Sequence, residues 1–338
     1  MPELRKDPVR NSWVIIATDQ ALKTTDFPIN KNGVLVEGSQ ALCPFCPGNE
    51  AFTTPEISAY RRPGTEPNRS GWRVRTIPNK FSPFKLQGEF HLNHQGINTS
   101  NNGLGQHEVV IETPEHFLDF HQLSVEQITL VYRMLRERYR DLATDPRIKF
   151  IQIYKNRGIF AGASQTHSHS QVLALPMVPD QFRGIGEYYQ ETGKCLICSI
   201  LEQELSEQHR IIYESPSFIL LCPYAARFSW ETWIVPRGHQ EHFGDMNDQQ
   251  IDELAAIMKD FMSVLLTNLN DPSYNIIINS APINGPESRG YHWFMEINPR
   301  LMVQNGLETS CNFYINPVSP ELAATILGEK FLSQYKLP

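Results

Sequence analysis

The sequence lacks long apolar runs and has no excess of positive charge. Its longest uniformly apolar runs, such as residues 218–222, have the length of a strand, so we expect no membrane span and no membrane partner. The N-terminal residues are polar and do not contain the apolar core of a secretory signal, which predicts a cytoplasmic protein. Thirty Lys and Arg against 37 Asp and Glu leave a net charge of -7, the wrong sign for a surface that binds nucleic acid.

The composition is otherwise that of an ordinary globular protein, with 41% hydrophobic and 20% charged residues. This composition excludes a disordered, collagenous or coiled-coil chain. A length of 338 residues, at about 150 per domain, predicts two domains. We place them at residues 1–180 and 181–338, because the features described next occur once in each half.

Cysteine is scarce, but four of the six cysteines form two CxxC pairs. In a reducing compartment such pairs indicate metal binding or redox chemistry rather than structural disulfides. Two histidines follow each pair, 51 positions apart in the first half and 53 in the second, which a redox motif does not require. Four Cys and His donors are the usual ligands of a closed, structural zinc site. We therefore predict two zinc sites, Cys43, Cys46, His116 and His167 in the first half and Cys195, Cys198, His239 and His292 in the second.

The two halves also repeat one pattern of secondary structure. Apolar residues with helical spacing follow Ser124, where Gln127 completes a capping-box pattern, and follow Asn247 in the second half. Runs rich in β-branched and aromatic residues come next, at 149–156 and 274–280. One long helix per half predicts an α+β fold, in which a mostly antiparallel sheet carries the helices on one face.

Residues 162–171, GASQTHSHSQ, carry the candidate chemistry. Alternate residues of a strand face the same side, so His169 and Gln171 would project into one cleft beside the first metal site. A neutral imidazole can attack phosphorus to give a phosphoramidate, and an amide N–H can hold a phosphoryl oxygen. The backbone of Gly162 and Ser164 can approach a phosphate closely. Taken alone, an HxH pair is also compatible with metal ligands or core residues.

These motifs, CPFC at 43–46, PEH ending at His116 and above all GASxxHxHxQ, resemble the galactose-1-phosphate uridylyltransferase family of the histidine-triad superfamily. The resemblance covers almost the whole chain and implies two fused histidine-triad folds, each with a mostly antiparallel sheet and a covering helix. It implies that His169 attacks the α-phosphorus of a nucleotide sugar in a ping-pong cycle, while Gln171 and Ser164 hold the transferred group. It also implies nucleoside contacts from Asn79 and Asn156 and a hexose contact from Glu308.

The same resemblance implies the partners, which are a nucleotide sugar, a sugar 1-phosphate or phosphate, and a second copy of the chain in a homodimer. In the second half the residue that matches the nucleophile is not a histidine, and two further features depart from the family pattern. Phe294 occupies the nucleophile's position in the second half, which predicts a chemically silent half. Segment 19–25 has Lys23 as its only cation, where the family usually has a basic phosphate-binding segment. Ser168 replaces the proline usual in uridylyltransferases, as it does in the ADP-glucose phosphorylase branch.

The function that we predict is uridylyl transfer from UDP-glucose to galactose 1-phosphate. The alternative is adenylyl transfer from ADP-glucose to phosphate. A histidine-triad hydrolase would use the same nucleophile, but such enzymes commonly have a third histidine at the position of Gln171. A non-catalytic nucleotide-binding protein would have the same fold without needing both His169 and Gln171.

Overall fold

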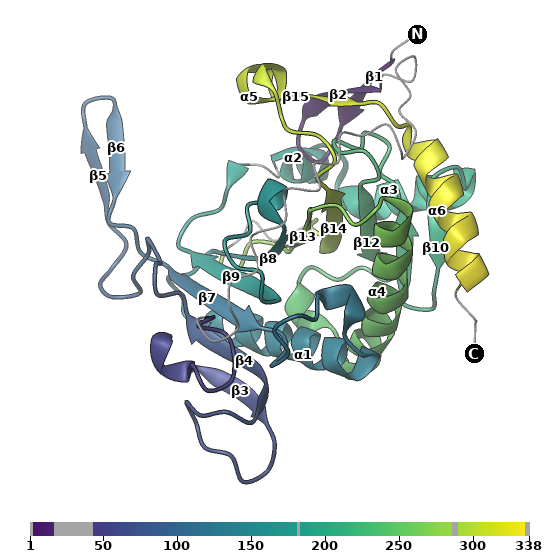
Figure 1. The fold of residues 1–338 in the computed structure, drawn as a ribbon. Helices are drawn as coiled ribbons and strands as arrows, with labels where there is room; N and C mark the ends of the chain where they lie inside the picture. Colours follow the sequence, from purple (N-terminus) through teal and green to yellow (C-terminus); the bar gives the residue numbers. More distant parts are fainter. Residues whose placement is uncertain (1–2, 17–42, 181–182, 286–289, 335–338) are drawn as a thin grey trace.

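The computed structural model describes residues 3–16, 43–180, 183–285 and 290–334. At its centre is a sheet of ten strands, all paired antiparallel (Figure 1). The strands lie in the order β10 (Ile211–Glu214), β11 (Phe218–Leu221), β12 (Thr232–Pro236), β14 (Phe294–Pro299), β13 (Tyr274–Asn279), β8 (Phe150–Arg157), β9 (His169–Leu175), β7 (Gln106–Ile111), β4 (Trp72–Pro78) and β3 (Ser58–Arg61).

The two halves of the chain build this sheet in the same order. From each edge to the centre, the strands are β3, β4, β7, β9 and β8 in the first half and β10, β11, β12, β14 and β13 in the second. β8 and β13 join the halves, with Tyr154 opposite Ile277 and Asn156 opposite Asn275. The repeat and the antiparallel pairing confirm the predicted α+β fold. The halves share one continuous sheet.

Two long helices begin where the sequence predicts them. α1 (Val125–Leu142) begins after Ser124, and α4 (Asp248–Asn268) begins after Asn247. Both N-cap side chains accept a hydrogen bond from the backbone N–H three residues later, which satisfies a donor that has no partner within the helix. The two helices contribute to the same buried apolar cluster, because their apolar stripes face the same side of the sheet.

The capping box predicted at Ser124 is only half formed. The side-chain oxygen of Gln127 does not accept from the Ser124 backbone N–H, and its Nε2 group donates instead to the carbonyl oxygens of Arg73 and Glu112. Arg73 belongs to β4 and Glu112 directly follows β7, so the Gln127 side chain connects the first turn of α1 to the sheet.

The two faces of the sheet carry different side chains. On β9, Val172 and Ala174 belong to the cluster that includes α1, α4 and α6 (Pro320–Gln334). The alternate residues of β9, which include His169 and Gln171, therefore face the opposite side. On that side α2 (Arg183–Thr192) and α3 (Leu196–Glu207) pack over the second half of the sheet.

Smaller elements complete the described chain. The N-terminal hairpin of β1 (Glu3–Asp7) and β2 (Ser12–Ile16) pairs with β15 (Phe313–Asn316), which runs parallel to β2 after α5 (Gly306–Cys311). The internal repeat does not predict this sheet, because its strands come from opposite ends of the sequence. Short 3-10 helices lie at η4 (Glu50–Phe52), η5 (Phe120–Gln122), η6 (Ile159–Ala161) and η8 (Phe243–Asp245).

A hairpin of β5 (Leu92–Gln95) and β6 (Asn98–Asn101) projects from the body of the molecule in Figure 1. Every residue of its two strands is exposed. The hairpin therefore contributes little to the core.

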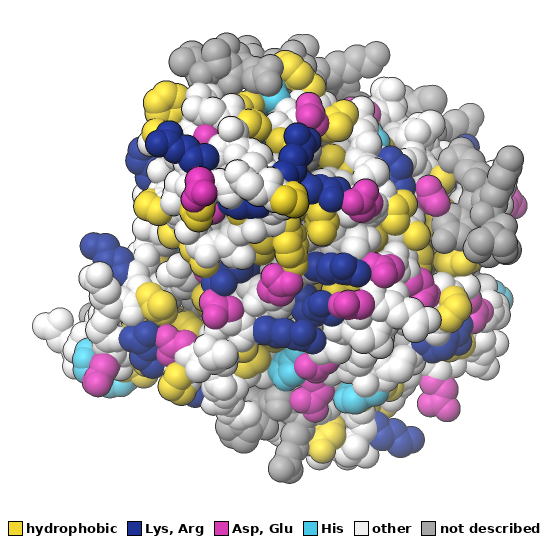
Figure 2. Space-filling model, turned by 90° about the horizontal axis from the view of Figure 1, so that it is seen from below, with side chains coloured by type: hydrophobic (Ala, Val, Ile, Leu, Met, Phe, Trp, Pro, Cys, Tyr) yellow, Lys and Arg dark blue, Asp and Glu magenta, His cyan; other side chains and the backbone are white. Residues whose placement is uncertain are grey.

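No helix in the described part of the chain is both long and apolar enough to cross a membrane. Figure 2 shows that, on the face seen from below Figure 1, Lys and Arg side chains are interleaved with Asp and Glu. Ion pairs join α1 and α4, with Arg133 3.1 Å from Asp252 and Arg136 2.7 Å from Asp248.

Candidate active site and metal sites

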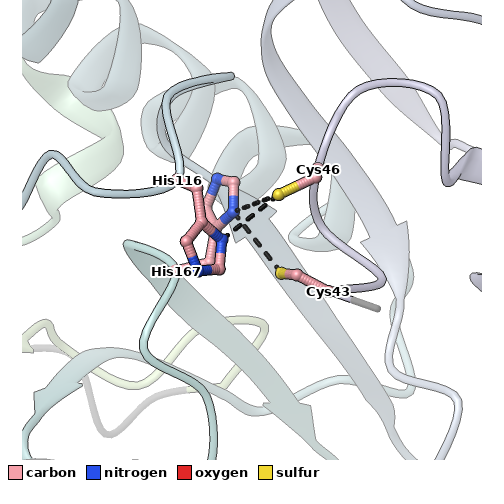
Figure 3. Close-up of side chains that lie close together, drawn as sticks. All are labelled: Cys43, Cys46, His116 and His167. Atoms are coloured by element: carbon pink, nitrogen blue, oxygen red, sulfur yellow. Dashed lines mark hydrogen bonds between the residues drawn. The ribbon is translucent and has the colours of Figure 1, made fainter. Parts of the chain in front are cut away.

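The first Cys and His group assembles beside the start of β9, as Figure 3 shows. Cys43 and Cys46 lie on the loop before η4, His116 on the loop after β7, and His167 two residues before β9. All four side chains are buried, and one ligand atom of each lies within 4.8 Å of the others. The structure thus brings together four donors that are far apart in the sequence.

The distances in this group fit a tetrahedral metal ion. Cys46 Sγ lies 3.2 Å from His116 Nδ1 and 3.6 Å from His167 Nδ1, and Cys43 Sγ also lies 3.6 Å from His167 Nδ1. Metal–sulfur bonds of about 2.3 Å and metal–nitrogen bonds of about 2.0 Å place sulfur and nitrogen about 3.5 Å apart in a tetrahedron. Burial raises the pKa of the Cys46 thiol to about 12, so a thiolate here requires the charge of a bound cation.

His167 is oriented by a second contact. Its Nε2 group lies 2.7 Å from the Thr113 carbonyl oxygen and donates to it, which leaves the Nδ1 lone pair toward the two sulfurs. Burial lowers the pKa of His167 to about 4, so the ring is neutral near pH 7.

The second Cys and His group has the same composition but is less buried. Cys195 caps α3 and Cys198 lies in its first turn, while His239 follows β12 and His292 precedes β14. Cys198 Sγ is 3.3 Å from His239 Nδ1 and 3.4 Å from His292 Nδ1. The two cysteines are partly exposed and His239 is exposed, whereas His292 is buried. This group could also hold a metal ion, at a more accessible position.

His169 is the first residue of β9 and is held in one orientation. Its Nδ1 lies 2.8 Å from the His167 carbonyl oxygen, so the Nδ1–H donates there and Nε2 keeps its lone pair. The Phe45 ring meets both His167 and His169 edge-on, with centroids 6.2 and 5.4 Å apart, so both imidazoles lie on one side of the chain. Burial, followed by the nearby Lys155 charge, lowers the pKa of His169. A neutral imidazole with a free Nε2 can act as a nucleophile.

The opposite side of the same strand carries a buried charged network. Lys155 Nζ is 2.7 Å from a Glu112 carboxylate oxygen, 2.9 Å from Ser168 Oγ and 3.3 Å from the His169 carbonyl oxygen. The hydroxyls of Ser168 and Ser170 both donate to Glu112, at 2.6 and 2.5 Å. These bonds fix the backbone of the segment that carries the two imidazoles.

Gln171 faces the same side as His169 and belongs to a neutral polar cluster. Its Oε1 atom lies 2.8 Å from His107 Nε2 and 3.1 Å from the Tyr154 hydroxyl. Asn79 Nδ2 lies 3.3 Å from His107 Nδ1, so a predicted nucleoside contact is part of the cluster. The sequence did not lead us to predict His107 and Tyr154 as members of this cluster. Tyr154 could have been found, because it lies two positions before Asn156 on the same strand face.

The other predicted substrate-binding residues lie on several different elements. The Asn156 side chain accepts a hydrogen bond from Asn275 at 2.8 Å and lies near Gly162, which adopts a left-handed conformation at φ 79°. Ser164 is exposed in the loop before His167. Glu308 lies on α5, which is apart from β9 in Figure 1, and accepts a hydrogen bond from the Asn305 backbone. The chain therefore does not bring Glu308 to His169. Lys23 lies outside the described residues.

Comparisons with known proteins agree with this arrangement. Residues 1–179 match the N-terminal domain, and residues 181–307 the C-terminal domain, of galactose-1-phosphate uridyl transferase. The chain belongs to the galactose-1-phosphate uridyl transferase family. One member, ADP-glucose phosphorylase of Arabidopsis thaliana, is 36% identical over 98% of this chain and 94% of its own length. Galactose-1-phosphate uridylyltransferase of Thermotoga maritima is 29% identical over 97% of this chain and 98% of its own.

Solved structures of the uridyl transferase family show the same architecture. The crystal structure of Arabidopsis thaliana ADP-glucose phosphorylase with bound ADP-glucose matches with a TM-score of 0.79 and 33% identity. The match covers 97% of this chain and 99% of that chain. The resemblance inferred from the motifs is therefore confirmed for the family and for the fold.

In this member of the family, the second half has no counterpart of the nucleophile. Phe294 begins β14 as His169 begins β9, and Glu296 stands where Gln171 stands. Phe294 packs against Trp233 with ring centroids 4.6 Å apart. A buried phenylalanine cannot form a bond to phosphorus, so the candidate nucleophile belongs to the first half.

Proposed function

We propose that this chain transfers a nucleotidyl group from a nucleotide sugar through a covalent bond to His169. The observation that carries the proposal is the orientation of His169. Its Nδ1–H is engaged by a backbone carbonyl, so the ring presents a lone pair at Nε2. Gln171 lies two residues further along the same strand face. Ser164 and Gly162, in the loop before the strand, would supply donors to the phosphate.

The reaction proceeds in two displacements. The Nε2 lone pair attacks the α-phosphorus, the bond from that phosphorus to the bridging oxygen breaks, and hexose 1-phosphate leaves with the electron pair. An oxygen of the acceptor phosphate then attacks the same phosphorus, the phosphorus–nitrogen bond breaks, and the neutral imidazole is regenerated. Gln171 stabilises the negative charge that develops on the phosphoryl oxygens in both steps.

We assign uridylyl transfer between UDP-glucose and galactose 1-phosphate as the main function. A specific observation favours adenylyl transfer to phosphate as a second candidate. The Arabidopsis thaliana ADP-glucose phosphorylase is more similar to this chain than the Thermotoga maritima uridylyltransferase, at 36% against 29% identity. Asn79 and Asn156 would contact the nucleoside in either case. Glu308 would contact the hexose of a second subunit, because its own chain holds it apart from His169.

Zinc is the metal that we propose for both Cys and His groups, because two thiolates and two imidazoles in a tetrahedron suit it best. Four protein ligands leave no position for water, so the ion would fasten the Cys43 loop and the start of α3 to the sheet. The division into units at residues 1–180 and 181–338, and the homodimer, stay predictions. Light scattering in solution tests the homodimer.

The test is intact-mass spectrometry after mixing the protein with UDP-glucose or ADP-glucose in separate reactions without acceptor. We expect one nucleotidyl group per chain, whose mass identifies the base, and its loss after addition of galactose 1-phosphate or phosphate. His169→Ala should form no adduct and should lose about 10⁴-fold or more in turnover. An adduct that decays at the same rate without acceptor would indicate a hydrolase. An unchanged mass with both donors would refute covalent catalysis.

A further inference from the structure

The side-chain oxygen of Gln171 is engaged on both sides by neighbouring strands. His107 Nε2 lies 2.8 Å away and the Tyr154 hydroxyl 3.1 Å away, while the two donors are 3.4 Å from each other. We propose that His107 and Tyr154 are positioning residues that orient the Gln171 amide so that its N–H₂ group faces the transferred phosphoryl group. This inference rests on the proposed function, because it takes the phosphoryl group to be the ligand of Gln171.

The strand register explains why these two residues meet Gln171. Tyr154 of β8 lies directly opposite Gln171, so the two side chains project from the same face. On the other flank Val109 of β7 is opposite Gln171, and His107 lies two positions before Val109. A diagonal neighbour on the same face is within reach of a long or aromatic side chain. The three side chains therefore form a row across β7, β9 and β8.

The orientation of the amide decides whether Gln171 can bind a phosphoryl group. An amide has an acceptor end and a donor end, whereas phosphoryl oxygens of a nucleotide sugar only accept. Gln171 would repel the phosphoryl group if its oxygen faced the cleft. Two donors on Oε1 favour the productive orientation and leave Nε2 free, since no contact within the described part of the chain engages Gln171 Nε2.

The protonation of the two donors suits this role. Burial raises the pKa of Tyr154, so its hydroxyl keeps the proton that it donates. Burial lowers the pKa of His107, so the neutral ring carries a single proton near pH 7. Because Gln171 Oε1 can only accept, that proton is on His107 Nε2. Asn79 Nδ2, which can only donate, lies 3.3 Å from Nδ1 and 3.4 Å from Nε2, and Nδ1 is the ring nitrogen left to accept from it.

The experiment is a double-mutant cycle on the rate of adduct formation in a single turnover, with donor affinity measured separately. Tyr154→Phe and His107→Ala should each slow adduct formation by about fivefold to tenfold, the effect of one hydrogen bond, and should change donor affinity less. Gln171→Ala should cost about a hundredfold. In the Gln171→Ala background, the substitutions at His107 and Tyr154 should have almost no further effect, because they act only through the amide.

Two control variants test whether the loss of rate is specific to residues that contact Gln171. Tyr60→Phe also removes a hydrogen-bonded hydroxyl, one bonded to Glu137 on α1, and should leave the rate unchanged. His94→Ala, in the exposed hairpin, should do the same. Metal content and circular dichroism identify any variant that has not folded, and Tyr154→Phe, which keeps the ring, carries the test if His107→Ala does not fold.

The outcomes separate this inference from the proposed function. Equal losses in the Gln171→Ala and wild-type backgrounds would show that His107 and Tyr154 act independently of the amide, and would overturn the inference. Wild-type protein that forms no adduct with either donor would overturn the proposed function instead. Rescue of His107→Ala by His107→Asn, which can again donate to Gln171, would support the positioning role.

Discussion

Replacing Lys155 by methionine should destabilise the protein strongly, because it leaves a buried carboxylate without its cation. The Lys155 side chain is 4% exposed and that of Glu112 is 0% exposed, and their charged atoms lie 2.7 Å apart. Removing one partner of a buried ion pair costs about 3–5 kcal/mol. The hydroxyls of Ser168 and Ser170 still donate to Glu112 but carry no charge, so they do not replace the ammonium group.

This energy converts to a measurable shift in melting temperature. An unfolding entropy of about 2.1 cal/mol/K per residue, applied to 338 residues, gives about 0.7 kcal/mol/K for the chain. A loss of about 4 kcal/mol should therefore lower the melting temperature of Lys155→Met by about 6 °C if unfolding is cooperative. Differential scanning calorimetry of the metal-loaded protein measures this shift and tests the cooperativity.

Two further variants complete this measurement. Lys155→Met combined with Glu112→Gln removes both charges and should recover part of the loss, because no unpaired charge stays buried. Arg73→Met breaks an exposed pair with Glu126 and should cost less than about 1 kcal/mol. If Lys155→Met melted within about 1 °C of the wild type, or if the double variant were less stable than the single one, the reasoning from burial would be refuted.

Three other predictions follow from the same contacts. A chelator should remove metal from the second Cys and His group before the first, because His239 is exposed and the first group is buried, and metal analysis over time should give two phases. Burial lowers the pKa of His107 below its ordinary 6.5, so below that pH the unfolded chain binds more protons than the folded chain. The free energy of unfolding should therefore fall as the pH drops below 6.5. Urea titrations of wild type and His107→Asn should show a smaller fall in the variant. Replacing residues 92–101 by a short Gly-Ser turn should leave the melting temperature and the metal content of the protein nearly unchanged, because the strands of this hairpin are exposed. A large loss of either would contradict this prediction.

The sequence predicted the elements whose signals are local or repeated. The helices after Ser124 and Asn247 were found because apolar spacing and N-cap residues are read within one segment. The two metal groups were found because the Cys pairs and histidines recur at nearly equal spacing, although their ligands come from separate loops. His169 and Gln171 were found on one face because alternation along a strand needs no knowledge of the partner strands.

The contacts that the sequence did not predict depend on pairing between distant segments. His107 meets Gln171 only through the register of β7 against β9, and Tyr154 only through that of β8 against β9. The prediction that Gln127 completes a capping box was wrong, because in the folded chain its side-chain amide donates to the backbone carbonyls of Arg73 and Glu112. A local sequence pattern does not show which distant backbone groups the folded chain brings close to a side chain.

The second half shows how one strand position can lose its chemistry without losing its place in the fold. Glu296 occupies the position of Gln171, but it is buried and lies 2.6 Å from an Arg227 guanidinium nitrogen and against Arg10. Asn279 donates to the same carboxylate at 2.6 Å. Arg10 comes from the turn between β1 and β2, so the N-terminal hairpin supplies a second cation to Glu296 beside Arg227. An ionised carboxylate has no proton to donate to a phosphoryl oxygen, and the oxygens of Glu296 are engaged by Arg10, Arg227 and Asn279. The contacts around Glu296 thus anchor the N-terminal hairpin to the sheet, and nucleotidyl transfer is left to the half in which that position is an amide.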